Sequence, residues 1–258
     1  MTPILELNHI NYSYHTPDGE TKALSNISFS LSQGEFAAVV GPSGCGKSTL
    51  LSLIDGLMQP ENGTMTLNGE PLTENSSRIG YMLQHDHLFE WRTVYRNVLL
   101  GSEINGHITP EIRLRADELL RQYGLERFRN SRPSELSGGM RQRAALIRTL
   151  ILNPDLLLLD EPFSALDYQT RLTVSDDIGQ IIRRSGKTAL LVTHDLSEAV
   201  SLADRVIVLT KRPASVAKII PVAFSAEYDT PLRRRSAPEF KNYFNEIWKE
   251  LNRDEQIN

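Results

Sequence analysis

A glycine-rich segment near residue 40 has the residue types that hold a phosphate group. Residues 41–48 fit the pattern G-x-x-x-x-G-K-[ST], directly after the apolar run 35–40 and before a helical pattern that starts at Lys47. Glycines let the backbone N–H groups of such a loop point inward, and the N-terminus of the following helix favours negative charge. In this pattern the lysine reaches the β- and γ-phosphates of a nucleotide, and the Ser48 hydroxyl binds Mg²⁺. The residues expected to bind the nucleotide here are Gly41, Pro42, Ser43, Gly44, Cys45, Gly46, Lys47, Ser48 and Thr49.

Two acidic residues follow a second apolar run. Leu156–Leu159 are four consecutive leucines, and Asp160 and Glu161 come directly after them. Ligands of parallel sheets bind at the carboxyl ends of the strands, so Asp160 is placed to hold Mg²⁺ and Glu161 to polarise an attacking water. With a phosphate loop upstream, this pair indicates nucleotide hydrolysis rather than two solvated acids at a strand end. The chain lacks the Asn-Lys-x-Asp stretch that reads guanine in common GTPases, so adenine is the expected base.

A third segment reads Leu-Ser-Gly-Gly-Met-Arg-Gln over residues 136–142 and opens another helical pattern. Ser137, followed by Gly138 and Gly139, makes a second helix N-terminus that favours an anion. One γ-phosphate does not need two such cradles from a single chain. The economical hypothesis is that this segment binds the nucleotide of a second subunit.

Composition limits the class of protein that carries these segments. The 258 residues are 40% hydrophobic and 23% charged, with a net charge of −4. These values exclude intrinsic disorder as the main state and argue against a nucleic-acid backbone as the main partner. No apolar run approaches the ~20 residues that span a bilayer, and the N-terminus lacks a secretion signal. The single cysteine, Cys45, excludes an internal disulfide. We therefore expect a globular protein of the cell interior.

A frame of strands must position the three segments. Apolar runs at 35–40, 155–159, 188–193 and 205–210 predict buried strands separated by helix-length segments, which implies a mostly parallel sheet with both faces covered. Further short strands are expected over residues 4–14 and within 23–40.

Helical periodicity governs the rest of the chain. The helix that starts at Lys47 is expected to run to about Leu57. Between about 85 and 153 the pattern is helical throughout, with one helix that starts after Thr109 and ends at Gly124 and another that starts after Ser137. The last amphipathic stretch covers 240–251. The run 233–235 is three arginines, which are expected to form a solvated face, with contact to anionic lipid as the alternative.

The three segments, taken together and in this order, resemble the motifs of ATP-binding cassette (ABC) ATPases. The resemblance covers residues 4 to 210 and implies an α/β fold: a P-loop NTPase core, with a mostly parallel sheet and an antiparallel N-terminal β part, and a helical insertion. It implies one ABC domain over the whole chain. Within that domain, the nucleotide-binding core covers 1–84 and 154–210, the helical subdomain 85–153, and a tail 211–258.

The resemblance assigns roles to single residues. Tyr14 resembles the aromatic residue that stacks on adenine, with Tyr12 as the competing candidate and core packing as the alternative for either. Gln84 resembles the glutamine that joins Mg²⁺ and the attacking water to the helical insertion. His194 resembles the histidine that contacts the γ-phosphate, and residues 164–167 (Ser-Ala-Leu-Asp) resemble the loop that crosses the dimer interface.

The resemblance also implies cofactors, namely ATP and Mg²⁺, and a catalytic and metal-binding set. The residues implied for catalysis are Glu161, His194, Gln84 and Lys47, and those implied for the metal are Ser48, Gln84 and Asp160.

A head-to-tail homodimer is the assembly that the family mechanism implies. Each ATP lies between residues 41–49 of one subunit and 137–139 of the other, so closure needs ATP and hydrolysis reopens the dimer. Transport then requires integral membrane permease subunits and, indirectly, an extracytoplasmic solute-binding protein, while no nucleic acid is expected as a partner. The chain would lie at the cytoplasmic face of the cell membrane, held there through the permease.

An aromatic stretch after Gln84 is the candidate permease contact. Phe89 and Trp91 are expected to be exposed anchors that receive a short permease helix, with a place in the core of the insertion as the alternative. Glu90 stands where a proline is common in relatives.

The chain is similar to the ATPase subunits of bacterial importers for nitrate, sulfonates and taurine, or for thiamine-precursor pyrimidines. That similarity depends on residues 84–94, on 211–213 and on the short tail, and the phosphate site carries no information about the cargo. One alternative is a non-transport ABC ATPase that acts as an ATP-gated dimerising switch. Another is a P-loop kinase, which would have no use for residues 136–142.

Overall fold

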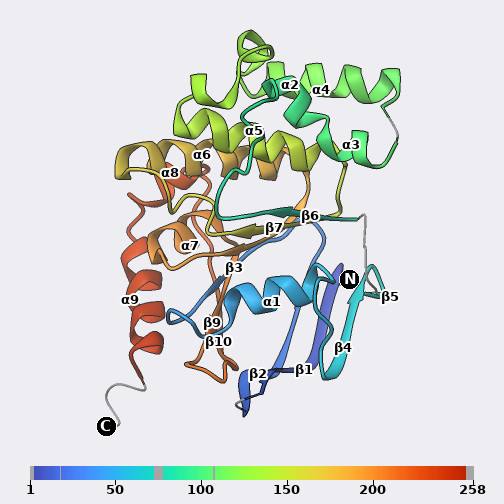
Figure 1. The fold of residues 1–258 in the computed structure, drawn as a ribbon. Helices are drawn as coiled ribbons and strands as arrows, with labels where there is room; N and C mark the ends of the chain where they lie inside the picture. Colours follow the sequence, from blue (N-terminus) through green and yellow to red (C-terminus); the bar gives the residue numbers. More distant parts are fainter. Residues whose placement is uncertain (1–2, 18, 73–77, 107, 254–258) are drawn as a thin grey trace. The chain divides into compact units, whose positions relative to one another are not determined.

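The computed structural model describes residues 3–17, 19–72, 78–106 and 108–253 of the chain. The chain forms two compact units (Figure 1). One consists of residues 1–76 and 179–258, and the other of residues 77–178.

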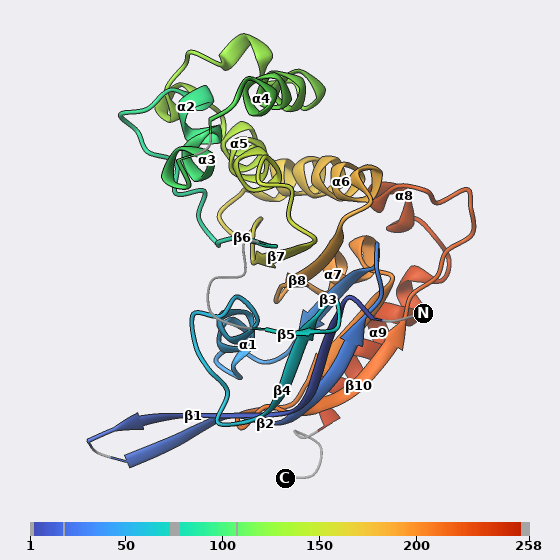
Figure 2. The same cartoon turned by 90° about the vertical axis from the view of Figure 1, so that its right-hand side faces the viewer.

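An antiparallel sheet opens the first unit, and it carries the predicted N-terminal strands. Its strand order is β2-β1-β4-β5, and every neighbouring pair is antiparallel. β1 and β2 run side by side beyond the end of β4 (Figure 2), as their register from Leu5↔Leu31 to Thr16↔Gly19 requires. The bounds of these strands are β1 Leu5–Thr16, β2 Gly19–Leu31, β4 Asn62–Leu67 and β5 Glu70–Pro71.

The predicted apolar strands of the first unit are parallel. β3 (Phe36–Val40) lies between β8 (Thr188–Val192) and β9 (Arg205–Leu209), and both pairings are parallel. Every residue of β3 and β8 is buried, which explains why their sequences are unbroken apolar runs. β10 (Val216–Pro221) adds an antiparallel edge beside β9, and the sequence did not predict it. The expected α/β class, with a mostly parallel sheet and an antiparallel N-terminal part, is confirmed.

The helices of the first unit cover this parallel sheet. α7 packs on β3, and α9 packs on β9, β10 and α7. The Arg-rich run lies in and beside α8, and it is not a uniformly solvated face. Arg234 donates to the Ser201 carbonyl (3.2 Å) and its guanidinium lies 5.3 Å from the centre of the Phe224 ring. The bounds of these helices are α1 Lys47–Ile54, α7 Leu196–Leu202, α8 Pro231–Arg234 and α9 Phe240–Leu251.

The helix after the glycine-rich loop is shorter than predicted. α1 ends at Ile54 rather than near Leu57, because Gly56 adopts φ = 79° and the chain leaves the helix there. Leu57 is consequently exposed. Asp55, which follows the last helical residue, is half-buried, and burial raises its pKa to about 6.

The carboxyl group of Asp55 makes stability depend on pH. An unfolded Asp titrates near about 3.9, so the folded state keeps a proton that the unfolded chain releases, and it loses stability as the pH rises from about 4 to 6. We expect Asp55→Asn to raise the free energy of unfolding by about 1–2 kcal/mol near neutral pH, a discounted value because the group is partly exposed. Urea unfolding near pH 7.5 and near pH 4 checks this, since the gain is expected to vanish at the lower pH. An equal gain at both would contradict it.

The second unit joins a parallel strand pair to a group of helices. β6 (Ile79–Met82) and β7 (Leu156–Asp160) are parallel, with Ile79 opposite Leu156. The helices between these strands form the predicted helical insertion, in which α5 packs on α2, α3, α4 and β6. Their bounds are α2 Val94–Val98, α3 Leu100–Ile104, α4 Pro110–Gln122 and α5 Gly138–Leu150, and α6 (Tyr168–Ser185) begins in this unit and continues past its last residue, 178.

Both predicted helix starts in this unit are confirmed. The Thr109 hydroxyl accepts from the N–H of Ile112 and Pro110 takes the first helical position of α4, which ends before Gly124 at φ = 73°. The Ser137 hydroxyl accepts from the N–H of Met140 at the start of α5 (3.4 Å).

Candidate functional site

The glycine-rich loop after β3 has a shape that only glycine allows at two positions. A Cβ on Gly41 would lie 2.9 Å from Cys45 Sγ, and one on Gly46, at φ = 121°, would lie 2.9 Å from a Leu24 methyl group. Gly46 is also the N-cap of α1, and no side chain of the described residues caps that helix. The N–H groups of its first turn therefore suit an anion such as a phosphate.

Lys47 places a buried positive charge at this loop. Its Nζ donates to the carbonyl oxygens of Gly41 (2.9 Å) and Pro42 (3.0 Å), and only 7% of the residue is exposed. Among the described residues no carboxylate pairs with this ammonium group. A buried charge with neutral partners favours an anionic ligand, because burial removes it from water without supplying an opposite charge. The loop therefore fits a nucleotide phosphate.

Tyr14 lies against the helix that follows the loop. Its hydroxyl is 2.8 Å from Thr49 Oγ1, and the residue is 40% exposed, so it is not a core side chain. The Tyr12 ring meets the Tyr14 ring edge-on, with 5.1 Å between the ring centres. The structure thus brings both candidate aromatic residues to one place and leaves Tyr14 the more exposed of the two.

The two acidic residues predicted at a strand end lie where β7 ends. Asp160 is the last residue of β7 and accepts from the Tyr81 hydroxyl (3.3 Å). Glu161 follows with φ = 45°, a left-handed conformation that costs an L-residue about 1–2 kcal/mol. Strain of this kind is kept where the surrounding structure enforces it, and it gathers at functional sites.

Gln84 is connected to this strand end. Its Nε2 donates to Ser164 Oγ (3.2 Å), and the Ser164 hydroxyl donates to the carbonyl of Glu161 (2.9 Å). Of the predicted residues in the second unit, Gln84 and Glu161 are thus joined through one side chain. Sequence reasoning assigned Ser164 to a dimer contact and did not foresee this bridge.

The Ser-Gly-Gly segment starts α5 in close contact with α6 and the loop before it. Ser137 and Gly138 are exposed, whereas Gly139 is buried. A Cβ on Gly139 would lie 2.5 Å from a Val174 methyl group, and one on Gly138 would lie 2.9 Å from Leu166. These glycines let the start of α5 approach its neighbours, and they leave Ser137 accessible.

His194 lies between β8 and α7 in the first unit, and it is exposed. The residues around it are fixed by hydrogen bonds. Asp195 Oδ1 accepts from the N–H groups of Ser197 (2.8 Å) and Glu198 (3.2 Å), and the Thr193 hydroxyl donates to Glu198 (2.7 Å). An ordered turn therefore holds the predicted histidine.

The oxygen donors of the predicted metal set are of the kinds that Mg²⁺ binds. Within the described part of the chain, no group of three or more His, Cys, Asp or Glu side chains is placed to hold a metal ion. Ser48, Gln84 and Asp160 supply one hydroxyl, one amide and one carboxylate. Mg²⁺ commonly takes one or two carboxylates together with substrate phosphates, so this donor set fits an ion that arrives with a nucleotide.

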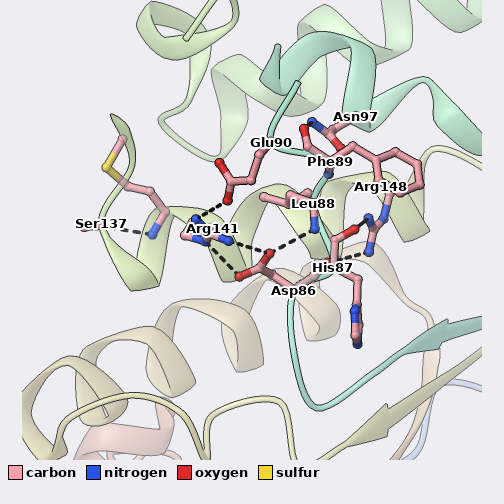
Figure 3. A network of polar contacts seen from close by, with 10 residues as sticks. Asp86, His87, Leu88, Phe89, Glu90, Asn97, Ser137, Arg141 and Arg148 are labelled. Carbon is pink, nitrogen blue, oxygen red and sulfur yellow. Dashed lines mark hydrogen bonds and ion pairs between the residues drawn. The ribbon is translucent and has the colours of Figure 1, made fainter. Parts of the chain in front are cut away.

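Sequence reasoning missed a group of polar residues beside Gln84. Asp86, Asn97, Arg141 and Arg148 make hydrogen bonds around residues 86–90 (Figure 3). The available signal was a pair of arginines seven residues apart, which places them two turns apart on one helix face.

The helices of the described residues include none with the length and apolar character to cross a membrane. Trp91 is 72% exposed, as expected, and stacks on Phe89 with 4.7 Å between ring centres. Phe89, which was also expected to be exposed, is only partly exposed.

Comparison with known proteins shows the family to which the chain is similar. The sequence model of a family described as "ABC transporter" matches residues 24–164. The chain is 43% identical to the uncharacterized ABC transporter ATP-binding protein YtlC of Bacillus subtilis (96% of this chain, 95% of that protein). It is 40% identical to the nitrate import ATP-binding protein NrtD of Synechocystis (94% and 93%) and 37% identical to the taurine import ATP-binding protein TauB of Roseobacter denitrificans (95% and 94%).

Solved structures show the same fold. One is a dimeric structure of a post-hydrolysis state of the ATP-binding cassette MJ0796 bound to ADP and Pi, with a TM-score of 0.72 and 30% identity over 85% of this chain and 99% of that one. Another is cbiO1 of Clostridium perfringens, described as part of the ABC transporter complex cbiONQ, with a TM-score of 0.75 and 28% identity over 86% and 89%.

Proposed function

The chain belongs to the ABC transporter family of ATP-binding proteins, and from this premise we propose that it is the ATP-hydrolysing subunit of a bacterial importer for a small solute. The observation that carries the importer assignment is the similarity, over nearly the whole of both chains, to proteins named as nitrate and taurine import ATP-binding proteins.

In this proposal, the main contacts of ATP are made by its phosphate groups. The loop 41–49 receives the phosphate chain, Lys47 supplies the positive charge, and Tyr14 stacks on adenine. The support is the loop with its two positions that require glycine, the buried ammonium group and the exposed Tyr14 ring beside α1. Mg²⁺, held by Ser48, Gln84 and Asp160, would neutralise charge on the phosphates.

Hydrolysis depends on Glu161, with His194 and Gln84 in support. The Glu161 carboxylate takes a proton from the attacking water, and His194 contacts the γ-phosphate. Gln84 orients the same water. The left-handed backbone at Glu161 and its link through Ser164 to Gln84 support a catalytic role for this strand end.

Two copies of the chain are needed to complete each site. Ser137–Gly139 of one copy bind the ATP that lies on residues 41–49 of the other. The exposed Ser137 at the start of α5 and the dimeric state of the ADP- and Pi-bound cassette support this arrangement. In the proposed arrangement, the nucleotide-binding core of each copy covers residues 1–84 and 154–210, and its helical subdomain covers residues 85–153.

The permease docks on the helical subdomain. Trp91 is exposed and stacks on the partly exposed Phe89, next to the segment that carries Gln84, and cbiO1 is described as part of a transporter complex. The chain then lies at the cytoplasmic face of the membrane, and a solute-binding protein delivers the cargo from outside. Nitrate, sulfonate or taurine, or a thiamine-precursor pyrimidine, is the proposed cargo class.

Trp91→Ala tests whether the chain depends on a membrane partner. In cells of the native host, we expect the wild-type chain to sediment with membranes and Trp91→Ala to leave them, with at least about a tenfold rise in its soluble fraction, because a buried aromatic anchor at an interface contributes about 2 kcal/mol or more. Quantitative blotting of the two fractions measures this.

Trp248→Ala is the matched control, because Trp248 is also exposed (57%) but lies on α9. It should sediment as wild type does. A wild-type chain that stays wholly in the soluble fraction would overturn the importer assignment and favour the ATP-gated switch.

A further inference from the structure

Arg141 on α5 holds two carboxylates of the segment that follows Gln84. Its Nε and Nη2 donate to the two oxygens of Asp86 (2.9 and 3.2 Å), and its Nη1 donates to Glu90 Oε1 (2.8 Å), as Figure 3 shows. The guanidinium fork therefore contacts both ends of residues 86–90. Paired contacts of this kind fix orientation as well as distance.

Arg148 holds the backbone of the same segment. Seven residues beyond Arg141, it lies on the same face of α5, and it donates to the carbonyls of Asp86 (2.7 Å) and His87 (2.8 Å). His87 adopts φ = 45°, so the backbone turns sharply where Arg148 holds it.

Asn97 completes the attachment from α2. Its buried side chain accepts from the N–H of Phe89 (2.7 Å) and donates to the Phe89 carbonyl (3.1 Å). The N–H of Leu88 donates to Asp86 Oδ1 (3.0 Å). Residues 86–90 are therefore bound to α2 and α5 by side chains, although they follow β6 in the sequence.

The ion pair between Asp86 and Arg141 is partly shielded from water. The side chains are 17% and 28% exposed, so water screens their contact less than it screens the ion pairs on the surface. Although burial raises the pKa of Asp86, hydrogen bonds from Arg141 and Leu88 and the charge of Arg141 hold it below its usual value. The carboxylate stays charged at neutral pH, and a variant that removes its partner leaves that charge uncompensated.

The residues of the clamp formed by Asp86, Glu90 and Arg141 are close in sequence to three parts of the proposed machinery: Gln84, Trp91 and Ser137. Arg141 is four residues, about one turn, after Ser137. Asp86 is two residues after Gln84, and Glu90 immediately precedes Trp91. A displacement of residues 86–90 is therefore passed to the first turn of α5.

We propose that Arg141 is a positioning residue for hydrolysis at the partner subunit's ATP: through Asp86 and Glu90 it fixes the first turn of α5, and with it Ser137–Gly139, relative to the segment that carries the permease contact. This inference rests on the proposed shared site. Gln84 keeps its own contact with Ser164, so the clamp acts mainly on the site that receives Ser137, in the other copy.

Mixed dimers of two differently tagged copies test this. One copy carries Glu161→Gln, so only one ATP turns over, and that ATP lies on the loop of the unmodified copy and meets Ser137 of the Glu161→Gln copy. We expect Arg141→Lys, which keeps the charge but cannot contact both carboxylates as a planar fork, to lower kcat at least about tenfold when placed in the Glu161→Gln copy. In the other copy it should lower kcat less than about threefold.

Two further measurements separate positioning from folding. The double variant Asp86→Asn/Glu90→Gln removes the same contacts from the other side and should reproduce the asymmetry. The affinity of each separate subunit for fluorescent ATP should stay within about twofold of wild type. Arg143→Lys, on the same helix but bonded to the Tyr123 carbonyl, and Asp117→Asn, paired with Arg129, are matched controls that should leave kcat unchanged in either copy.

A reference variant distinguishes failure of this inference from failure of the shared site. Ser137→Arg in the Glu161→Gln copy should abolish turnover. If it does, and the Arg141 and Asp86/Glu90 variants lower kcat equally in both copies or in neither, the clamp has no positioning role and the shared site stands. If Ser137→Arg acts only in its own copy, the shared site itself is overturned, and this inference with it.

Discussion

A chain that carries Glu161→Gln is expected to lose ATP turnover by about a hundredfold or more while it still binds ATP. The amide cannot accept the proton of the attacking water, and general-base catalysis is worth about 10²–10⁴ in rate. The substitution keeps the shape of the side chain at a position where the backbone is already held at φ = 45°. Because hydrolysis is what reopens the proposed dimer, the variant should accumulate as an ATP-bound dimer.

Phosphate release and size-exclusion chromatography check the two halves of this expectation. With ATP and Mg²⁺ the variant should elute as a dimer, and without ATP as a monomer. Asp155→Asn is the control, since Asp155 lies just before the other end of β7 and pairs with Arg78 (2.7 Å), away from Glu161. Full turnover in Glu161→Gln would refute its catalytic role, and a variant that stays monomeric with ATP would contradict the shared site.

Lys47→Ala is expected to weaken nucleotide binding by about a hundredfold or more. The ammonium group would form charge-assisted hydrogen bonds to two phosphates, each worth about 1.5–3 kcal/mol, and about 1.4 kcal/mol corresponds to tenfold in affinity. The substitution also removes the donor to the carbonyls of Gly41 and Pro42, so part of the loss comes from a less ordered loop.

Titration with a fluorescent ATP analogue measures the affinity, and thermal unfolding followed by circular dichroism shows whether the loop change has spread to the fold. Lys218→Ala is the matched control, because Lys218 is half-exposed and pairs with Glu246 (2.9 Å) on α9. Unchanged ATP affinity in Lys47→Ala would refute the role assigned to this lysine.

The sequence predicted best the elements whose signal is local. β3, β7 and α5 were predicted because their runs are apolar throughout or start with a capping serine, and these signals need no distant partner. β4, β5, β6 and β10 were missed. β6 is only four residues long and contains a glycine, and β10 alternates little and exposes Lys218 at the sheet edge. Such strands form because a neighbour is available, and the sequence of the strand itself does not show the neighbour.

The candidate site also has a part that the sequence predicts and a part that it does not. The phosphate loop is one contiguous segment, so its residues could be recognised together. The contacts Tyr14–Thr49, Gln84–Ser164 and Asp86–Arg141 join residues 35, 80 and 55 positions apart, and no spacing rule reports them. The roles assigned to single residues stay predictions, which the variants above test.

The only cysteine of the chain, Cys45, lies within the phosphate loop, and its buried sulfur packs where Gly41 has no side chain. Burial raises the pKa of the Cys45 thiol, although Lys47 opposes this, so little thiolate is present at neutral pH. Oxidants and alkylating reagents attack the thiolate, and they reach this sulfur only after the loop has opened. The packing that gives the loop its shape therefore also shields the cysteine of the proposed nucleotide site from oxidation.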